Sequence, residues 1–422
     1  MSKREWMAVG AIALCVSVVG GCVAGPGGDL VARAGMPAAG GPSGAGGRLE
    51  ATTSGGLAAG TVGATLTLAD PATATCAAQT LSAMTEPQRI GQLFLLGLPN
   101  DQLTSAVRAS IAEYHVGSVW FTATTSVGVA GIRAVAASVQ SLATSVATHG
   151  VRFFVAANQE GGYVQALRGM GFSTIPSALV QGSWSLATLQ ARAKAWGTQL
   201  RAAGVNLDFA PVADVVPPGG DATNAPIGQL QREYGHDPLT VKQHVSVFVK
   251  GMAQAGIATT AKHFPGLGYV TGNTDFVSSV TDTVTTPHGA TMQPFAAAIG
   301  AGVPFVMVSL ARYTRIDPAH LAVFSRTIIT GLLRGYLHFG GVVMSDALTA
   351  TAVATMSPAA RAIDFVAAGG DMLVVRSPAV ANAMATALAA QAARDAWFRG
   401  LVDAAVLRVL TAKTAYGLVP CG

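Results

Sequence analysis

The stretch AKHFPGLGYVTGNTD, residues 261–275, is the strongest indication of the fold in this sequence. It follows a short apolar run, places Lys262 and His263 at the expected end of a β-strand, and continues into a Pro/Gly-rich loop that carries Asp275. A (β/α)8 barrel keeps its chemistry on polar residues at strand ends and on the loops that follow them. The stretch therefore predicts a barrel with its functional residues at this end.

Apolar runs on both sides of this stretch predict more strands of the same kind. Near-continuous apolar runs are typical of parallel strands that are buried on both faces. Helical segments are expected between them, at Leu186–Ala203, Thr240–Ala255 and Ser357–Ala368. The predicted strands are Ser118–Thr122, Phe153–Ala157, Val205–Phe209, Ala258–Lys262, Phe305–Ser309, Val342–Ser345 and Met372–Val375.

This alternation favours a single α/β domain of the TIM-barrel type. A doubly wound open sheet is the alternative, but no GxGxxG sequence follows an early strand. The uncharged stretch 294–311 is interrupted by Gly302 and Pro304, so we expect a helix end and a buried strand, 303–310, rather than a membrane span.

Composition narrows the classes of function. The chain has 422 residues, of which 50% are hydrophobic and 11% charged, so a large buried core is possible. The net charge of +5 comes from scattered Lys and Arg, and no basic run with interleaved aromatic residues indicates nucleic acid binding. The histidines are dispersed, and HExxH and CxxC are absent, so we expect no metal site and no cofactor.

The N-terminus has the features of an export signal. Lys3 and Arg4 precede a short apolar segment, Trp6–Val19, and the sequence Val-Gly-Gly-Cys that ends at Cys22 resembles a bacterial lipobox. This predicts removal of residues 1–21, lipidation of Cys22, and anchoring at the outer face of the cytoplasmic membrane or in the cell envelope. The alternative is an ordinary secretory signal with an incidental cysteine.

A Gly/Ala-rich stretch follows, and residues 22–75 are expected to be a flexible tether to a domain at 76–422. In an exported chain the remaining cysteines, Cys76 and Cys421, lie at the two ends of this domain. Oxidising compartments favour disulfides, and domain ends often lie close together. We therefore predict a Cys76–Cys421 disulfide.

Polar side chains recur where the apolar runs end. A lone aspartate at such a position is often only a helix cap or a turn residue. Repetition at the same end of successive strands indicates a functional site instead. These residues are Asn158 and Glu160 within the sequence NQEGG, Asp208 and Asp214, Lys262 and His263, and Ser345 and Asp346.

Together these motifs resemble the β-N-acetylglucosaminidase branch of glycoside hydrolase family 3. The resemblance runs from Leu81 to about Leu407, in family order, and KHFPG followed by SDAL is its most specific part. It implies a barrel domain without the family's second domain. The matching sequences are NQEGGYVQALRG with Ile175-Pro176-Ser177, NLDFAPVADV, IGQLQREYGHDP, AKHFPGLG, GGVVMSDAL and AGGDMLVV.

The resemblance also implies residue roles. Asp346 matches the nucleophile, which would form a covalent glycosyl-enzyme and retain the anomeric configuration. Lys262, His263 and Arg232 match residues that hold the sugar. A serine hydrolase centred on Ser345 is disfavoured because GxSxG is absent around it.

Two positions depart from the family pattern for sugar contacts. Asn158 replaces an aspartate, which removes a charge while leaving an amide that can donate and accept hydrogen bonds. Ala166 replaces an arginine. Sugar preference or affinity is therefore expected to differ from the family norm.

The acid/base loop departs as well. The family's Asp-Ser-His aligns without gaps to Asn273, Thr274 and Asp275, which makes Asp275 the predicted acid/base and Asn273 the residue that orients it. A shifted alignment would place Val277 and Ser279 there and leave Asp282 and His288 as fallback groups. A carboxylate at this position would repel phosphate, so we expect hydrolysis rather than phosphorolysis.

The sequence thus predicts an exo-glycosidase that removes terminal β-linked N-acetylglucosamine from peptidoglycan fragments. Its partners would be a carbohydrate substrate and, through the lipid, the membrane, and a monomer is expected. Two alternatives stay open. One is a β-glucosidase or β-xylosidase of the same family, and the other is a sugar-binding lipoprotein that has lost efficient catalysis.

Overall fold

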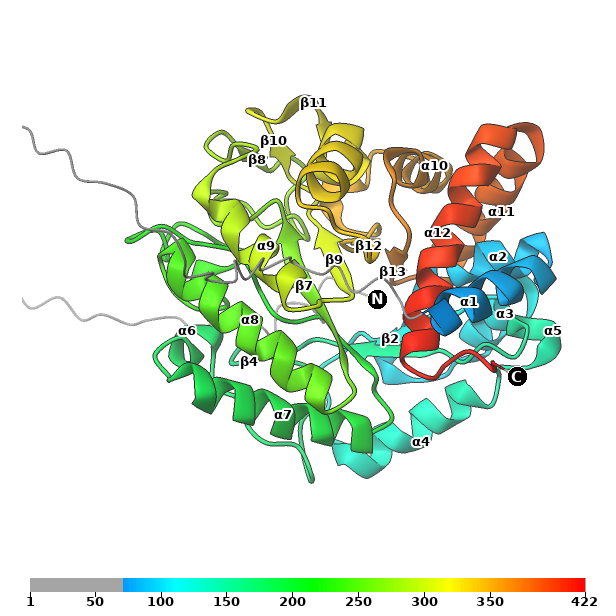
Figure 1. Ribbon diagram of the computed structural model, residues 1–422, viewed down its shortest axis with the longest axis horizontal. Helices are drawn as coiled ribbons and strands as arrows, with labels where there is room; N and C mark the ends of the chain where they lie inside the picture. Colours follow the sequence, from blue (N-terminus) through cyan, green and yellow to red (C-terminus); the bar gives the residue numbers. More distant parts are fainter. Residues whose placement is uncertain (1–70, 422) are drawn as a thin grey trace, which may run out of the picture. The chain divides into compact units, whose positions relative to one another are not determined.

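Eight parallel strands form a barrel at the centre of residues 71–421, the part of the chain that the computed structural model describes (Figure 1). The strands follow one another around the sheet in chain order, and a bridge between Met344 and Met372 joins the first strand of the sheet to the last. The predicted α/β barrel is confirmed. The predicted signal peptide, Cys22 and the tether up to residue 70 lie outside the described residues.

Seven of the barrel strands lie where the apolar runs predict them, and the sequence analysis missed the eighth, β1. Its sequence, FLLGL, has no β-branched residue, so local propensity does not favour a strand. Pairing with β2 and β13 determines its conformation instead. The barrel strands are β1 Phe94–Leu98, β2 Ser118–Phe121, β3 Phe154–Ala157, β6 Leu207–Asp208, β7 Ala258–Phe264, β9 Phe305–Val308, β12 Val342–Ser345 and β13 Leu373–Val375.

The apolar runs are continuous because each strand is covered on both sides. In β3, Phe154 and Ala156 point into the barrel interior, while Val155 and Ala157 pack toward the surrounding helices. Aromatic rings fill the interior: Phe154 meets Phe305 edge to face at 5.2 Å between ring centroids. The barrel is therefore a packed core, and its chemistry is confined to one end.

Helices surround the sheet, and several begin at the polar caps that the sequence offers. Asp237 caps α8 through the Thr240 N–H at 2.9 Å, and Ser357 caps α10, each just before a proline. The α-helices are α1 Pro71–Ala83, α2 Glu86–Gln92, α3 Ser105–Tyr114, α4 Gly128–Gln140, α5 Ser145–Thr148, α6 Ala178–Gln181, α7 Leu186–Ala202, α8 Pro238–Gln254, α9 Gln293–Gly300, α10 Pro358–Ala368, α11 Pro378–Arg394 and α12 Ala396–Ala415.

The loops between the barrel strands contain short strands and helical turns. A hairpin of β4 and β5 follows β3, and β8, β10 and β11 form a small separate sheet. Their bounds are β4 Gln159–Gly161, β5 Val164–Gln165, β8 Thr281–Asp282, β10 Arg312–Tyr313 and β11 Asp317–Leu321, with short 3-10 turns η2 Pro99–Asp101, η3 Gly228–Leu230, η4 Ala290–Met292, η5 Ala322–Phe324 and η7 Thr351–Val353, and a π-helix, η6, at Thr327–Tyr336.

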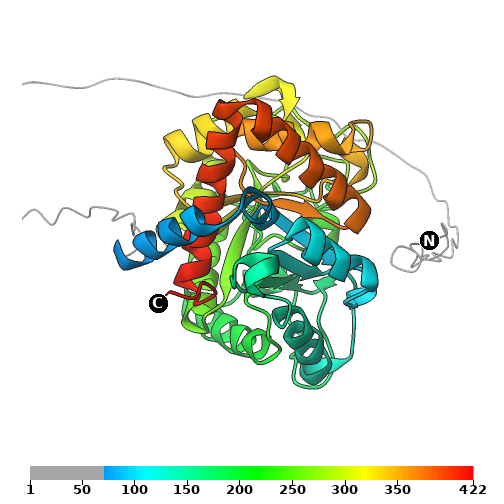
Figure 2. The same cartoon turned by 90° about the vertical axis from the view of Figure 1, so that its right-hand side faces the viewer.

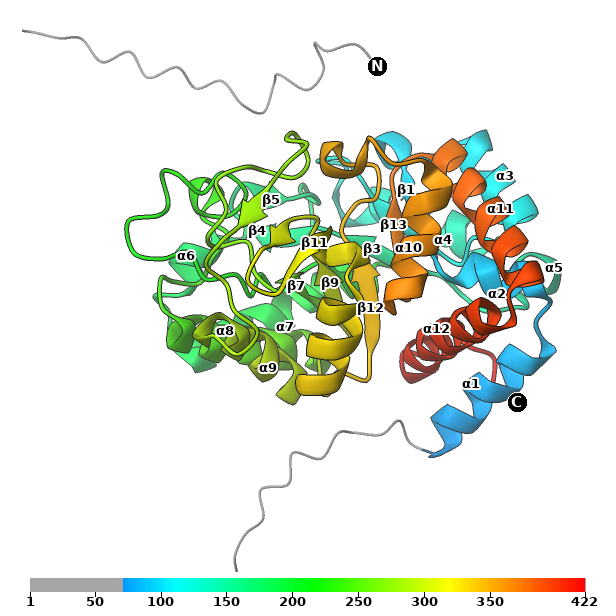
Figure 3. The same cartoon turned by 90° about the horizontal axis from the view of Figure 1, so that it is seen from above.

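The two ends of the described chain lie side by side. Figures 2 and 3 show α1 packed against α12, with the C-terminus beside them. A disulfide joins Cys76 to Cys421, whose Cα atoms are 5.8 Å apart. Because α1 begins at Pro71, residues 71–75 are helical and do not belong to the predicted tether.

The uncharged stretch 294–311 is part of α9 and then β9, as the sequence indicates. Between residues 71 and 421, no helix combines the length and the apolar character that crossing a membrane requires.

Candidate active site

The carboxyl ends of the barrel strands bring most of the predicted site residues together. Asn158 directly follows β3, Lys262 and His263 end β7, and Asp346 directly follows β12. Arg232 reaches the same place from the loop before α8. The pairing of these strands in one parallel sheet is what places these residues at a single edge.

Glu160 is the centre of a buried ion-pair network. Its carboxylate accepts two hydrogen bonds from Arg232, each 2.8 Å, and lies 2.6 Å from the Lys262 ammonium. Lys262 also donates to the Asn158 side-chain oxygen at 2.9 Å. One buried carboxylate thereby fixes both cations that the sequence analysis assigns to sugar binding.

The charges in this network are mutually dependent. Burial would raise the pKa of Glu160, but the adjacent Arg232 and Lys262 charges outweigh it and hold that pKa at about 2. Burial lowers the pKa of Lys262, and the Glu160 carboxylate opposes this change. Burial also raises the pKa of Asp208 to about 7, and one of its carboxylate oxygens accepts the Gln159 N–H at 3.0 Å.

Asp214 orients His263. The Nδ1 atom of His263 lies 2.8 Å from the Asp214 carboxylate, and its Nε2 lies 3.4 Å from an Arg232 nitrogen. Because a guanidinium only donates, Nε2 accepts and Nδ1–H donates to Asp214. Asp214 also accepts the backbone N–H groups of His263 at 3.1 Å and Leu267 at 2.8 Å, which fixes the loop after β7.

The glycines of the KHFPGLG sequence allow this loop to pass close to its neighbour. A Cβ atom on Gly268 would lie 1.8 Å from the Val215 carbonyl oxygen, so no larger residue fits there. The Asp214 segment and the loop after β7 are thereby held in contact, and His263 is held with them.

Asp346 has a free oxygen at the half-buried end of β12. Its Oδ1 accepts the Ala347 N–H at 2.7 Å, whereas Oδ2 accepts no hydrogen bond from residues 71–421. The neighbouring Ser345 hydroxyl is buried and accepts the Val374 N–H at 3.0 Å, which helps to close the barrel. Ser345 is therefore structural, and Asp346 presents the carboxylate oxygen that is free at this strand end.

Asp275 lies within the electrostatic reach of Asp346. Burial raises the pKa of Asp275 and so does the Asp346 charge, whereas Arg376, Arg232 and His263 lower it. Asp275 as a whole residue is exposed to solvent. A carboxyl with a raised pKa next to an ionised carboxylate has the character of an acid/base group.

The Asp275 loop is tied to the segment that follows Asp346. Thr351 donates its hydroxyl to the Asp275 carbonyl at 2.7 Å, and the Ala352 N–H donates to Thr274 at 3.1 Å. Asn273 accepts the Asp275 backbone N–H at 2.9 Å. The Asn273 side chain thus stabilises the turn, and it forms no hydrogen bond with the Asp275 carboxyl that it was expected to orient.

The fallback groups are engaged elsewhere. The Asp282 carboxylate is buried and accepts from Val284 N–H, Thr285 N–H and the Thr285 hydroxyl, at 2.7, 2.7 and 2.6 Å. The exposed His288 ring packs on Tyr336 of η6, with 4.2 Å between ring centroids. Asp282 therefore has no free carboxylate oxygen like that of Asp275, and His288 is held against Tyr336.

Sequence reasoning counted Glu160 and Asp214 among the strand-end residues without giving them a role, and it did not single out Arg376. Arg376 directly follows β13, lies over the Trp120 ring at 5.0 Å, and acts on the Asp275 carboxyl by its charge. Glu160 and Arg376 stand close to the ends of β3 and β13, and Asp214 lies in the loop after β6, so their positions relative to the strands were the available signal. The residues that they contact are distant in sequence, so these side-chain contacts could not be predicted from the sequence.

A small hollow of about 120 Å³ adjoins Asn158 and Ala166, the two positions that depart from the family pattern. Thr122, Thr124 and Gln165 contribute to its lining. It therefore offers polar contacts at Ala166, the position where the family pattern predicts an arginine.

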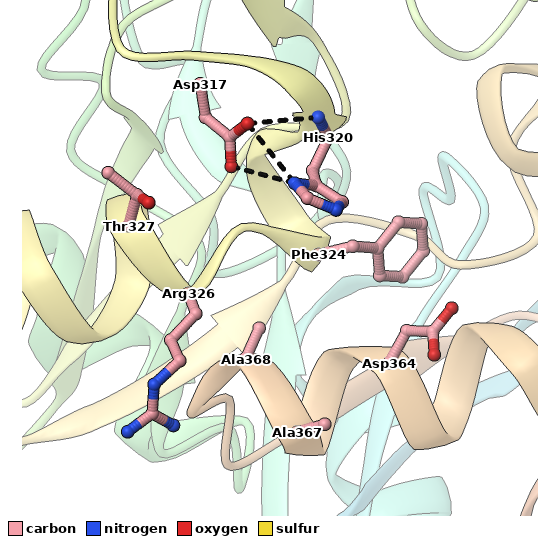
Figure 4. A pocket seen from close by; sticks show the side chains of 8 residues that line it. All are labelled: Asp317, His320, Phe324, Arg326, Thr327, Asp364, Ala367 and Ala368. Carbon is pink, nitrogen blue, oxygen red and sulfur yellow. Dashed lines mark hydrogen bonds and ion pairs between the residues drawn. The ribbon is translucent and has the colours of Figure 1, made fainter.

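A larger hollow of about 350 Å³ lies between η5, η6 and α10 (Figure 4). Its carboxylate, Asp317, already accepts from the Ser325 hydroxyl at 2.6 Å and from His320 Nδ1 at 3.0 Å. None of the predicted site residues lines it. We therefore place the chemistry at the strand ends and not in this hollow.

Metal-type ligands gather at one place beside the site. Within residues 71–421, Asp221, Glu233 and His236 bring their ligand atoms within 4.8 Å of one another. Glu233 is the residue next to Arg232, but no side chain of this group touches the Glu160 network through a hydrogen bond.

Comparison with known proteins agrees with this geometry. A sequence model described as the glycosyl hydrolase family 3 N terminal domain matches residues 85–412. A β-hexosaminidase of Xylella fastidiosa is 33% identical over 278 residues, which cover 63% of this chain and 80% of that protein. A β-hexosaminidase of Chromobacterium violaceum is 32% identical over 297 residues, which cover 68% of this chain and 79% of that protein.

Solved structures show the same resemblance. The crystal structure of a β-N-acetylhexosaminidase from Beutenbergia cavernae has a TM-score of 0.77 and 46% identity, and covers 78% of this chain and 98% of that one. The structure of a family 3 β-N-acetylglucosaminidase from a Paenibacillus species has a TM-score of 0.72 and 28% identity. The match covers 81% of this chain and 64% of that one.

Proposed function

The chain belongs to glycoside hydrolase family 3, and on that premise we propose that it is a retaining enzyme whose nucleophile is Asp346. It hydrolyses terminal β-linked N-acetylglucosamine, the activity that its β-hexosaminidase relatives support. The observation that carries the proposal is the free carboxylate oxygen of Asp346, next to a loop in which burial and the Asp346 charge raise the pKa of Asp275.

The two carboxyl groups would divide the reaction between them. Asp346 attacks the anomeric carbon, while Asp275 gives its proton to the departing oxygen, so a covalent glycosyl-enzyme forms and the aglycone leaves. Asp275, now ionised, then takes a proton from water, and that water displaces Asp346 from the sugar. Each step exchanges one bond at the anomeric carbon, and two inversions retain the configuration.

The ion-pair network would hold the sugar in place for this attack. Glu160 locks Arg232 and Lys262, and Asp214 locks His263, so these donors need little reordering when substrate binds. Asn158 adds an amide to this group of side chains, and its side-chain oxygen accepts a hydrogen bond from Lys262.

We propose peptidoglycan fragments as the source of the substrate and the cell envelope as the location. The support for both is the export signal with its lipobox-like Cys22, which would hold a monomeric enzyme outside the cytoplasmic membrane. Such an enzyme would release free N-acetylglucosamine faster from a disaccharide-peptide fragment than from a chitin disaccharide. Comparing the two substrates by product chromatography tests the assignment, and a strong preference for the chitin fragment argues against it.

Water is the proposed acceptor. An ionised Asp275 beside the anomeric carbon would repel a phosphate anion, so the rate should not rise with phosphate and no sugar 1-phosphate should form. Detection of N-acetylglucosamine 1-phosphate in phosphate buffer would refute this part of the proposal.

The direct test of the activity is release of nitrophenol from 4-nitrophenyl β-N-acetylglucosaminide. The parent protein should turn over the substrate, and Asp346→Asn should lose at least a thousandfold in kcat. Asp364→Asn, an exposed carboxylate in the larger hollow, is the matched control and should keep the parent rate. Failure of the parent on this substrate and on the matching glucoside would contradict the proposed function.

A further inference from the structure

A buried carboxylate next to the active site lacks a partner. Glu233 has no exposed surface, and neither of its carboxylate oxygens accepts a hydrogen bond from any residue of the described part of the chain. The backbone N–H groups of Arg232 and Glu233 lie nearby, but they form no hydrogen bond of normal geometry with it. A buried, unpaired carboxylate is unfavourable, so this arrangement needs an explanation.

Two further ligand-type side chains lie against it. The ligand atoms of Asp221, Glu233 and His236 are all within 4.8 Å of one another, and His236 Nδ1 is 3.6 Å from Asp221 Oδ1. That Asp221 oxygen is also buried and has no hydrogen-bond partner within residues 71–421. Three groups that could bind one ion thus converge, and two of them have unused oxygens.

The local charge balance favours a cation. Asp221, Glu233 and the nearby Asp214 are acidic, whereas the adjacent guanidinium of Arg232 is bound to Glu160. Among the described residues, no lysine or arginine forms an ion pair with Glu233 or Asp221. A bound cation would supply the missing charge.

We propose that Asp221, Glu233 and His236 bind a divalent transition-metal ion, with zinc as the best match. One imidazole nitrogen and two carboxylates form a donor set that suits zinc or manganese, and a water molecule would complete the coordination. Asp221 and His236 are only half-buried, so the ion could enter from solvent. The sequence analysis expected no metal because the histidines are dispersed and HExxH and CxxC are absent.

The ion would fasten the loop that carries Arg232. Asp221 lies near the middle of the segment between β6 and α8 and Glu233 near its end, so a shared ligand would cross-link the two parts. Asn224 already ties the loop to the segment after β7, donating to the carbonyls of Leu267 at 2.7 Å and Val270 at 2.8 Å. A metal would extend this clamp to the residue next to Arg232 and so position the guanidinium.

The test is metal binding by the full-length protein after treatment with a chelator. Isothermal titration with zinc chloride, and separately with manganese chloride, should give one site per chain. A hundredfold excess over Kd should raise the melting temperature by about 3 °C. These readouts do not depend on the glycosidase activity, so their failure and the failure of the proposed function are distinguishable.

Variants locate the site. Glu233→Gln and His236→Gln should each weaken zinc binding at least tenfold and remove most of the melting shift, and the half-exposed His236 keeps the test valid if Glu233→Gln does not fold. Asp364→Asn, close to the exposed His320 of the larger hollow, should leave both readouts unchanged. Absence of metal binding by the parent overturns the proposal, and so does binding that survives both substitutions.

Discussion

The guanidinium of Arg232 donates two hydrogen bonds of 2.8 Å to the carboxylate of Glu160, and both side chains are almost completely buried. The residues are 72 positions apart in sequence and meet only because the barrel closes. Since Lys262 shares the same carboxylate, Glu160 sets the position of both cations that we propose to bind the sugar.

Glu160→Gln should therefore impair binding and stability together. The neutral amide leaves two neighbouring buried cations without a counter-charge, which costs about 3 kcal/mol of unfolding free energy. KM for the nitrophenyl substrate should rise at least tenfold. Denaturant unfolding and steady-state kinetics check both, with Glu113→Gln on the exposed side of α3 as the control. An unchanged KM would show that Glu160 does not position the binding groups.

Asp275→Asn should impair substrates according to their leaving group. A sugar leaving group needs a proton, so hydrolysis of a disaccharide should fall by about 10²–10⁴-fold. Nitrophenolate leaves without a proton, so on the nitrophenyl substrate the slow step of the variant is attack of water on the glycosyl-enzyme. Azide needs no general base, so it should accelerate the variant on the nitrophenyl substrate and yield the β-glycosyl azide. No azide effect and an equal loss on both substrates would remove Asp275 from the acid/base role.

Arg376→Gln should move the pH dependence of the enzyme. Asp275 must be protonated to act as the acid, so kcat/KM falls as the pH rises through its pKa. The Arg376 charge lowers that pKa, and removing this charge raises it. The basic limb of the kcat/KM profile should therefore shift to higher pH. Arg399→Gln, exposed on α12, should leave the profile unchanged, and a shift to lower pH in Arg376→Gln would contradict the assignment.

Asp371 offers a test of stability at the opposite end of the barrel. It is fully buried just before β13 and accepts from Arg334 at 2.5 Å, Arg408 at 3.0 Å and the Val343 N–H at 2.7 Å. Asp371→Asn should lower the unfolding free energy by about 3–5 kcal/mol, because two arginines lose their shared carboxylate.

Activity per folded molecule should stay unchanged in Asp371→Asn. Residues at the N-terminal face of a barrel contribute to stability, whereas the chemistry takes place at the C-terminal face. The control is Asp403→Asn, which removes a partly exposed ion pair with Arg89 and should cost less than about 1 kcal/mol. Equal stability losses in the two variants would count against the difference in burial as the cause.

The sequence was sufficient for the barrel and for the strand ends on which the candidate residues stand. Continuous apolar runs mark strands buried on both faces, and Lys262, His263 and Asp346 end such runs, so their convergence followed from the topology. Strand β1 was missed because its leucines carry no strand preference of their own, and its neighbours in the sheet impose the conformation.

Pairings between side chains were not predictable in the same way. Glu160 lies within a quoted motif, yet its link to Arg232 depends on three-dimensional closure. Asn273 was expected to orient the Asp275 carboxyl, but its side chain hydrogen bonds to the backbone, a local turn contact common for asparagine. The catalytic and binding roles of the individual residues remain predictions.

The most direct test of the account is to identify the residue that becomes covalently attached to the sugar. A 5-fluoro-β-N-acetylglucosaminyl fluoride should form the glycosyl-enzyme quickly and hydrolyse slowly, because fluorine destabilises the oxocarbenium-like transition state while fluoride leaves readily. Tryptic peptide 335–361 contains Asp346 as its single acidic residue. We predict that mass spectrometry finds the sugar on this peptide, and a sugar attached to any other peptide in the inactivated enzyme would contradict the account.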